Sequence, residues 1–175
     1  WCPLMATSLD NAKKQMPDKL EVLSFHADGG LKSEASVILA KAYSVQQYPK
    51  AYVDGNMNTV SNSTDIPEVV SNVISLVKTM EENFKTVAGT SWNSSIKDNK
   101  ISLDLNVYFK EAGSYKVTAL LVEDNIVGYQ ADNITGSSND YIHNNVVRSA
   151  FSDELGDSAV ITYNGEKKQY NYSLD

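Results

Sequence analysis

Apolar side chains recur with helical spacing in three segments of the first half of the chain. One stripe predicts a first helix that ends before Pro17; its members are Met5, Leu9, Ala12 and Met16. Ser33 is expected to begin a second helix. The third and clearest helical pattern occupies residues 63–84, where Thr64 or Asp65 is expected to cap the helix.

Two extended segments separate these helices. The run LEVLSFHA, residues 20–27, predicts a buried strand. Pro49 opens a second strand, and Asp54-Gly55 predicts a hairpin whose return strand ends near Val60. We therefore expect residues 1–86 to form an α/β domain.

From about residue 87 the apolar period changes to two. The clearest alternation places polar residues between Ile101, Leu103, Leu105 and Val107. Turn signals stand at residues 97–100, 111–114 and 164–166, and residues 146–151 fit either a helix or a strand. Short alternating strands joined by turns predict that residues 87–175 form an antiparallel β-sandwich domain.

Charge and composition exclude several classes of function. The 175 residues are 42% hydrophobic and carry a net charge of −7, so neither nucleic acid nor anionic lipid is an expected partner. No apolar run approaches the roughly 20 residues of a membrane span. The sequence has no phosphate-binding glycine loop, nucleophile elbow or metal-ligand spacing, so no cofactor or metal is expected. A lone histidine such as His26 is more typical of a strand edge than of a metal site.

Cys2 and Pro49 are the candidate redox residues. A cysteine at a helix N-terminus feels the positive end of the helix dipole, which favours the thiolate; Cys2 is equally explained as a small buried residue. Pro49 is either a cis proline in a loop beside that cysteine or a trans proline opening an edge strand. The residues alone leave both alternatives open.

The order of these parts resembles thioredoxin, with the first strand lying before residue 1. The segments 120–130 (LLVEDNIVGYQ) and 141–151 (YIHNNVVRSAF) resemble the β domain of one family. That family comprises the outer-membrane proteins of Bacteroidetes-type bacteria named for a mass of about twenty-eight kilodaltons, in which a thioredoxin-like domain precedes a β domain. The residues that match its motif are Glu123, Asp124, Gln130, Tyr141, His143, Asn144, Val146 and Arg148.

The resemblance implies export to the outer membrane or cell surface, often as a lipoprotein held by an anchor upstream of residue 1. Family members often carry Cys-x-x-Cys-Pro at the first helix. Cys2-Pro3 then supplies the last two positions, and the first cysteine lies upstream; alternatively, Cys2 is the first cysteine and Met5 replaces the second. The 18-residue distance from Cys2 to Leu20 favours the upstream cysteine, whereas the preference of Pro3 for a first turn favours the alternative. We favour the upstream cysteine.

His143 and Arg148 are interpreted as structural rather than ligand-binding. Their separation of five places them on opposite faces of a strand. We expect His143 to bond a loop and Arg148 to pair with Glu123 or Asp124. The expected function is a non-enzymatic interaction module with a protein or glycan surface partner. The alternative is an exported thiol–disulfide oxidoreductase that uses Cys2, a second cysteine and Pro49.

Overall fold

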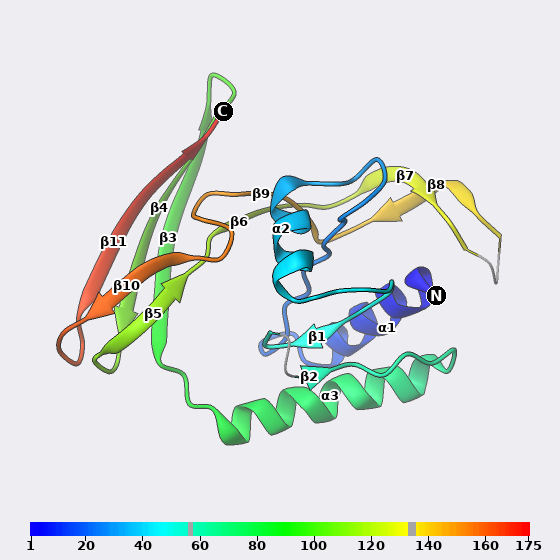
Figure 1. Cartoon of the computed structure of the whole chain (residues 1–175), viewed down its shortest axis with the longest axis horizontal. Coiled ribbons are helices and arrows are strands. Elements are labelled where there is room, and N and C mark those ends of the chain that lie inside the picture. Colours follow the sequence, from blue (N-terminus) through cyan, green and yellow to red (C-terminus); the bar gives the residue numbers. More distant parts are fainter. Residues whose placement is uncertain (56–57, 133–135) are drawn as a thin grey trace. The chain divides into compact units, whose positions relative to one another are not determined.

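The computed structural model describes residues 1–55, 58–132 and 136–175 and is a mixed α/β structure with mostly antiparallel strands in small sheets. The chain forms two compact units (Figure 1). Unit 1 comprises Trp1–Phe84 and Val122–Val147, and unit 2 comprises Lys85–Leu121 and Arg148–Asp175. The expected domains 1–86 and 87–175 placed residues 122–147 in the second half, whereas in the structure these residues pack with the first.

The predicted helices are confirmed, and all three described helices belong to unit 1: α1 (Cys2–Gln15), α2 (Glu34–Ala42) and α3 (Ile66–Asn83). The cap of α3 is Asp65, whose carboxylate accepts a hydrogen bond from the Glu68 N–H at 3.1 Å. Pro67 lies in the first turn of α3, where its missing N–H costs no helical hydrogen bond.

The core of unit 1 lies where α1 packs against α3 and a short hairpin. Strands β1 (Tyr52–Val53) and β2 (Asn58–Thr59) are antiparallel, which confirms the hairpin predicted at Asp54-Gly55; residues 56–57 of its turn lie outside the described residues. The buried members of the core come from all these elements: Met5, Ala12, Met16, Ala51, Val53, Val60, Val69, Val70, Val73 and Val77.

Residues 20–27 form an extended segment but not the predicted buried strand. Their one described bridge is parallel and joins Ser24 to Val146. Val22 is buried, while Leu23 and Phe25 are 45% and 37% exposed. The alternation shows that one face of this segment packs inward and the other faces solvent.

The insertion that completes unit 1 is built from four short strands: β6 (Leu120–Glu123), β7 (Ile126–Gln130), β8 (Ser138–His143) and β9 (Val146–Ala150). Strands β7 and β8 are antiparallel, and β6 pairs with β9. Residues 146–150, whose pattern also fitted a helix, are thus a strand. β6 and β9 carry the chain from unit 2 into unit 1 and back.

Unit 2 contains a three-stranded antiparallel sheet in the order β11-β4-β3 and a separate antiparallel pair, β5 with β10. The strand bounds are β3 (Ala88–Lys97), β4 (Lys100–Phe109), β5 (Gly113–Val117), β10 (Asp157–Ile161) and β11 (Lys167–Leu174). The turn predicted at residues 97–100 is confirmed, because Asp98 and Asn99 adopt φ values of 50° and 63° between β3 and β4. The core residues of unit 2 are Leu105, Val107, Phe109, Ala119, Ala159 and Ile161.

A buried carboxylate holds the turn before β11. Glu166 accepts hydrogen bonds from the backbone N–H and the hydroxyl of Thr162, at 2.7 and 3.0 Å, and forms an ion pair with Lys168. These contacts, led by the hydrogen bond from Lys168, lower the pKa of Glu166 from 4.5 to about 2. The carboxylate is therefore held in its charged form in the folded state.

Candidate functional site

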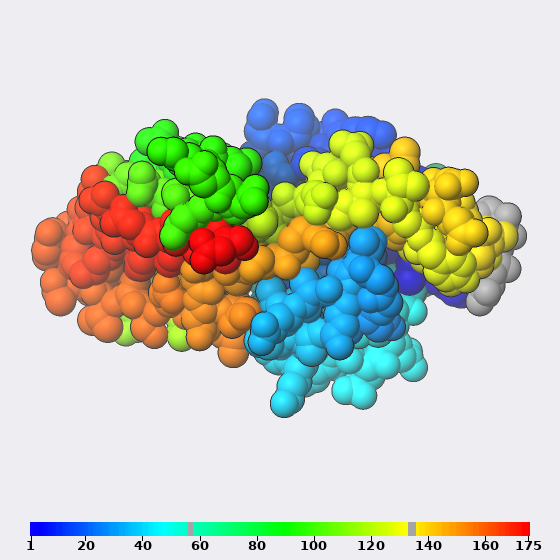
Figure 2. Space-filling view, turned by 90° about the horizontal axis from the view of Figure 1, so that it is seen from above, coloured from blue at the N-terminus to red at the C-terminus, as the bar shows by residue number. Residues whose placement is uncertain are grey.

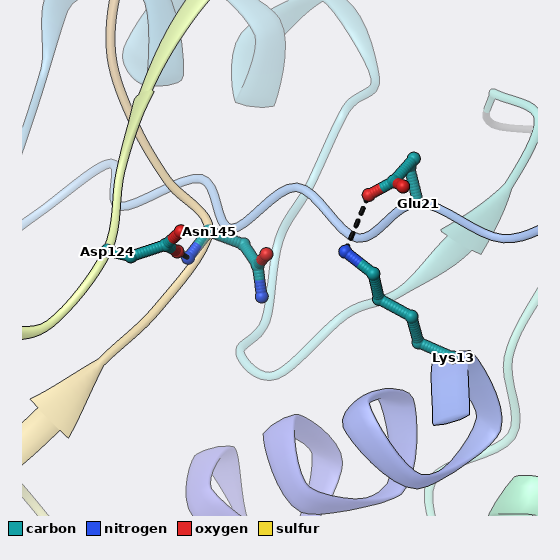
Figure 3. Close-up of polar contacts among 4 residues, drawn as sticks. All are labelled: Lys13, Glu21, Asp124 and Asn145. Carbon is teal, nitrogen blue, oxygen red and sulfur yellow. Dashed lines mark hydrogen bonds and ion pairs between the residues drawn. The ribbon is translucent and has the colours of Figure 1, made fainter. Parts of the chain in front are cut away.

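The family-motif residues of the insertion build two turns that hold each other. The first turn, Asp124-Asn125, separates β6 from β7, and the second, Asn144-Asn145, separates β8 from β9. Asp124 Oδ1 accepts the backbone N–H of Asn145 at 2.6 Å (Figure 3). Asn144 Oδ1 accepts the backbone N–H of Asn125 at 3.0 Å. Each turn thus supplies the side-chain acceptor for the other.

The sequence favours these turns locally. Asn125 and Asn145 have φ values of 60° and 57°, a left-handed conformation that asparagine tolerates better than most residues. The Asp and Asn that precede them have short side chains that readily accept backbone N–H groups. Each turn therefore forms where two Asx residues follow each other, and this explains why the chain bends between β6 and β7 and again between β8 and β9.

The bend brings the main chain to the extended segment 20–27. The Ser24 N–H donates to the Asn145 carbonyl at 2.7 Å, and the Val147 N–H donates to the Ser24 carbonyl at 2.9 Å. These are the bonds of the parallel bridge to Val146. The motif residues thus join the insertion to the N-terminal segment of unit 1.

Ser33 reinforces this junction, a role that the sequence did not indicate. Its Oγ donates to the Val147 carbonyl at 2.8 Å and accepts the Ser36 N–H at 3.2 Å as the cap of α2. Because that single proton goes to Val147, the 2.7 Å contact between the hydroxyls of Ser33 and Ser36 has Ser36 as donor. A 114-residue separation from Val147 left no local signal for this contact.

A shallow, open groove of about 430 Å³ lies between the two turns and the C-terminal part of α1. Its lining residues are Asp10, Lys13, Lys14, Pro17, Asp124, Asn125, Asn144 and Asn145. Lys13 Nζ lies 2.6 Å from the carboxylate of Glu21, while the Asn145 side chain points away from Asp124 (Figure 3). The chain around residues 122–130, yellow-green in Figure 2, forms part of the surface of unit 1. The exposed lining of the groove is mostly apolar, with amide, ammonium and carboxylate groups among it.

The two histidines of the chain are in contact at the end of β8, whose last residue is His143. His143 is 5% exposed, and its ring packs edge-on against His26 and Tyr141, with centroid distances of 5.4 and 4.8 Å. Among the described residues, His143 Nε2 has no hydrogen-bond partner. Burial, followed by the charge of Asp10, raises the pKa of Tyr141. The contact between His26 and His143 was not predicted, because nothing local links two residues so far apart in sequence.

The candidate redox residues have a mixed outcome. Cys2 is the first residue of α1, as expected, and is partly buried. Burial is the largest influence on this thiol and raises its pKa above 9.0, against the direction that the helix dipole favours. Pro49 precedes β1, and the Tyr48–Pro49 peptide bond is cis. The structure thus places Cys2 at the start of α1, where burial raises the pKa of its thiol.

The remaining motif residues do not gather into one site. The Gln130 side-chain amide donates to the neighbouring Ala131 carbonyl at 2.9 Å. Glu123 and Arg148 are exposed, whereas His143 is buried. His143 ends β8 and Arg148 lies in β9, beyond the Asn144-Asn145 turn, so the two residues do not share the single strand that the spacing argument assumed. The ion pair of Arg148 with Glu123 or Asp124 stays a prediction.

Within residues 1–55, 58–132 and 136–175, no cluster of three or more His, Cys, Asp or Glu side chains could hold a metal ion. The helices of these described residues are also too short or too polar to cross a membrane.

Comparison with known proteins identifies the family. The model of the family described as outer membrane protein Omp28 matches residues 37–175, which include most of α2, all of α3 and every described strand. Searches of the curated proteins and of the solved structures found no match. Because the matched region covers more than half of the chain, including both Asx turns, the chain belongs to the Omp28 family of outer membrane proteins, located at the outer membrane or cell surface.

Proposed function

We propose that the chain is a non-enzymatic interaction module of the cell envelope and that the shallow groove beside the two Asx turns is its binding surface. One observation carries the proposal: the motif side chains Asp124 and Asn144 hold backbone N–H groups at the groove wall. Acceptors engaged in this way shape a surface and take no part in proton transfer. The groups left facing the groove include the Asn145 amide and the Lys14 ammonium.

The ligand class that suits this surface is an oligosaccharide. Amides and carboxylates supply both donors and acceptors, which pair well with the hydroxyl groups of sugars. The groove is shallow and wet, so water-mediated contacts contribute as well. A protein segment is the competing partner, and the same variants test it.

The test uses a glycan array with the full chain, followed by calorimetry with the best oligosaccharide. Asn145→Gly removes the amide and keeps the left-handed backbone, so binding should weaken about tenfold, the value of one hydrogen bond. Asn99→Gly is the matched control, because Asn99 is also left-handed, with φ 63°, and lies in the β3–β4 turn of unit 2. Equal affinity of the two variants, or no glycan binding at all, would refute the glycan proposal.

We infer a thioredoxin-like scaffold for unit 1 and a sandwich for unit 2. The support in unit 1 is the order α1, extended segment, α2, cis Pro49, hairpin, α3. The main-chain N–H and C=O groups of Ser24 bond the insertion. Those of Leu23 and Phe25 therefore point to the opposite edge of the extended segment, where a strand preceding residue 1 fits. In unit 2, the β5–β10 pair contributes Ala159 and Ile161 to one core with the three-stranded sheet.

The second candidate function is thiol–disulfide exchange, favoured by the position of Cys2 at the start of α1. It requires a second cysteine three positions upstream, because a single thiol forms a mixed disulfide but cannot resolve it. Intact-mass measurement of the full-length protein after alkylation, with and without reductant, tests this. A redox-active pair gains two alkyl groups only after reduction, and the absence of a second reactive thiol excludes the mechanism.

A further inference from the structure

Strand β3 is an edge strand that is exposed along almost its whole length. It pairs with β4 on one side, and the described residues place no strand on its other side (Figure 1). Every residue of β3 except Ala88 is exposed. Trp92 and Ile96 are 63% and 78% exposed, so this edge carries apolar side chains as well as unpaired main chain.

The pairing register places these two side chains on the face that forms the core of unit 2. Trp92 lies opposite Leu105, and Ile96 lies opposite Ile101. Directly opposed residues of antiparallel strands project to the same face. Trp92 and Ile96 thus extend the apolar face of the sheet beyond the core that the β5–β10 pair helps to form.

The same register shows which main-chain groups are open. The Phe109 N–H donates to Glu166 and the Phe109 carbonyl accepts from Gly165, so odd-numbered residues of β4 face β11 and even-numbered ones face β3. The β3 residues opposite the even-numbered ones are odd-numbered, including Ser91 and Asn93. The N–H and C=O groups of Thr90, Trp92, Ser94 and Ile96 therefore point to the open edge.

The two edges of this sheet differ in charge. The β11 edge begins with Lys167 and Lys168, and lysines on an edge strand oppose pairing with another chain. Strand β3 has no charge between Ala88 and Ser95, and its single charged residue is Lys97 at the end. Neither edge strand carries an acidic residue, so the lysines are what distinguish them: β11 begins with two adjacent lysines, whereas β3 meets a copy of itself over an uncharged stretch from Ala88 to Ile96.

We propose that β3 pairs antiparallel with β3 of a second copy of this chain, about a two-fold axis at Ser94. This register sets Trp92 opposite the partner subunit's Ile96, on the same face, and sets Asn93 opposite the partner subunit's Ser95. All the open N–H and C=O groups from Trp92 to Ile96 then pair, and the two sheets become one six-stranded sheet. Pairs of an aromatic with a β-branched residue are favourable across antiparallel strands.

The surface available sets the strength of the dimer. Two tryptophans and two isoleucines at these exposures contribute at most about 600 Å² of buried surface, and the strand backbones add to it. Stable interfaces bury about 1,200–2,000 Å² in total. The dimer is therefore expected to be reversible, with a dissociation constant in the micromolar range.

Disulfide trapping tests the register in the full chain with Cys2→Ser. Two cysteines from Ser94→Cys would have Cα atoms about 5.5 Å apart in the proposed pairing, within disulfide range. Ser91→Cys is the control, because Ser91 is also exposed but lies six residues out of register, about 20 Å from its counterpart. Mild oxidation should link the first variant and leave the second monomeric. No linkage at Ser94, or equal linkage at both, overturns the register.

Sedimentation velocity tests the dimer itself. The unmodified chain should pass from monomer to dimer between about 1 and 200 µM. Ile96→Lys places a charge opposite the partner subunit's Trp92 and should raise the dissociation constant at least about tenfold. Val160→Lys is the control, since Val160 is a β10 residue with 64% exposure. A monomer at every concentration, or a dimer that resists Ile96→Lys, refutes the proposal.

Discussion

Replacing Ser33 with alanine removes three hydrogen bonds that meet at one buried hydroxyl. The Ser36 N–H loses the cap of α2, which costs about 1 kcal/mol. The Val147 carbonyl loses its Ser33 donor in a region where Ser33 is 7% exposed and Val147 is fully buried. Leaving a buried acceptor unsatisfied costs about 1–3 kcal/mol. We therefore expect the free energy of unfolding of unit 1 to fall by about 2–4 kcal/mol.

The assay is urea unfolding of the full chain, followed by far-UV circular dichroism at the helix band, which reports on unit 1 because α1, α2 and α3 all belong to it. Ser8→Ala is the matched control. Ser8 is 1% exposed, but its hydroxyl bonds only the Leu4 carbonyl within α1, so alanine should change stability by less than about 1 kcal/mol.

Hydrogen exchange separates the two roles of the Ser33 hydroxyl, which caps α2 and also bonds the Val147 carbonyl of the insertion. The Val147 N–H, which donates to the Ser24 carbonyl, should lose protection in Ser33→Ala if the hydroxyl holds the insertion in place. Equal stabilities of Ser33→Ala and Ser8→Ala, or unchanged protection of Val147, would refute the role assigned to Ser33.

Three further predictions concern single positions. Glu166 has a pKa lowered to about 2, so the stability that its carboxylate contributes is present above pH 4.5 and is lost as the pH falls toward 2. In acid titrations of unfolding, Glu166→Gln should therefore reduce the pH dependence of the stability of unit 2 between pH 4.5 and 2. An unchanged slope of stability against pH would contradict this. Gly156→Ala should lower the free energy of unfolding by about 2 kcal/mol, because φ is 87° and a Cβ would lie 2.8 Å from Thr118 Oγ1. Gly165→Ala, with φ 84° and open space around the new Cβ, should lower it by about 1 kcal/mol in the same thermal or urea unfolding. Equal losses in the two variants would show that the contact with Thr118 has no effect. Cys2 should react with iodoacetamide more slowly at pH 7 than an exposed peptide cysteine, with a rate that rises above pH 9, because burial raises the pKa of its thiol; a fast reaction at pH 7 would indicate an activated thiol.

Local patterns predicted the elements of this chain well. The helical stripe through Met5 and Met16, the cap before Pro67 and the turn at Asp98-Asn99 each depend on residues within a few positions of one another. Such signals are local because helix caps and two-residue turns are decided by neighbouring backbone and side-chain atoms.

The family motif was visible in the sequence, but its role was not. Asp124 and Asn144 were identified by resemblance, and the asparagines that follow them favour turns locally, but no local pattern indicates that Asp124 bonds Asn145 and that Asn144 bonds Asn125. The bond from Ser33 to Val147 spans 114 residues, and no spacing rule reaches that far. A site of this kind depends on which segments fold together, so only the contacts reveal it.

The sequence by itself determined the helices, the β1–β2 and β3–β4 hairpins and the alternating strands of unit 2, because each depends on short-range patterns of apolar, Asx and glycine residues. The hairpin predicted around residues 164–166 did not form, because β10 pairs with β5 and β11 with β4. The family was indicated by the resemblance of residues 120–130 and 141–151 to its β domain.

The tertiary structure alone decided that residues 122–147 return to pack with the N-terminal half, that His26 meets His143, and that burial raises the pKa of the Cys2 thiol. The physical reason is common to all three. Burial and long-range hydrogen bonds are properties of the packed chain, and they outweigh the local preferences that a sequence displays.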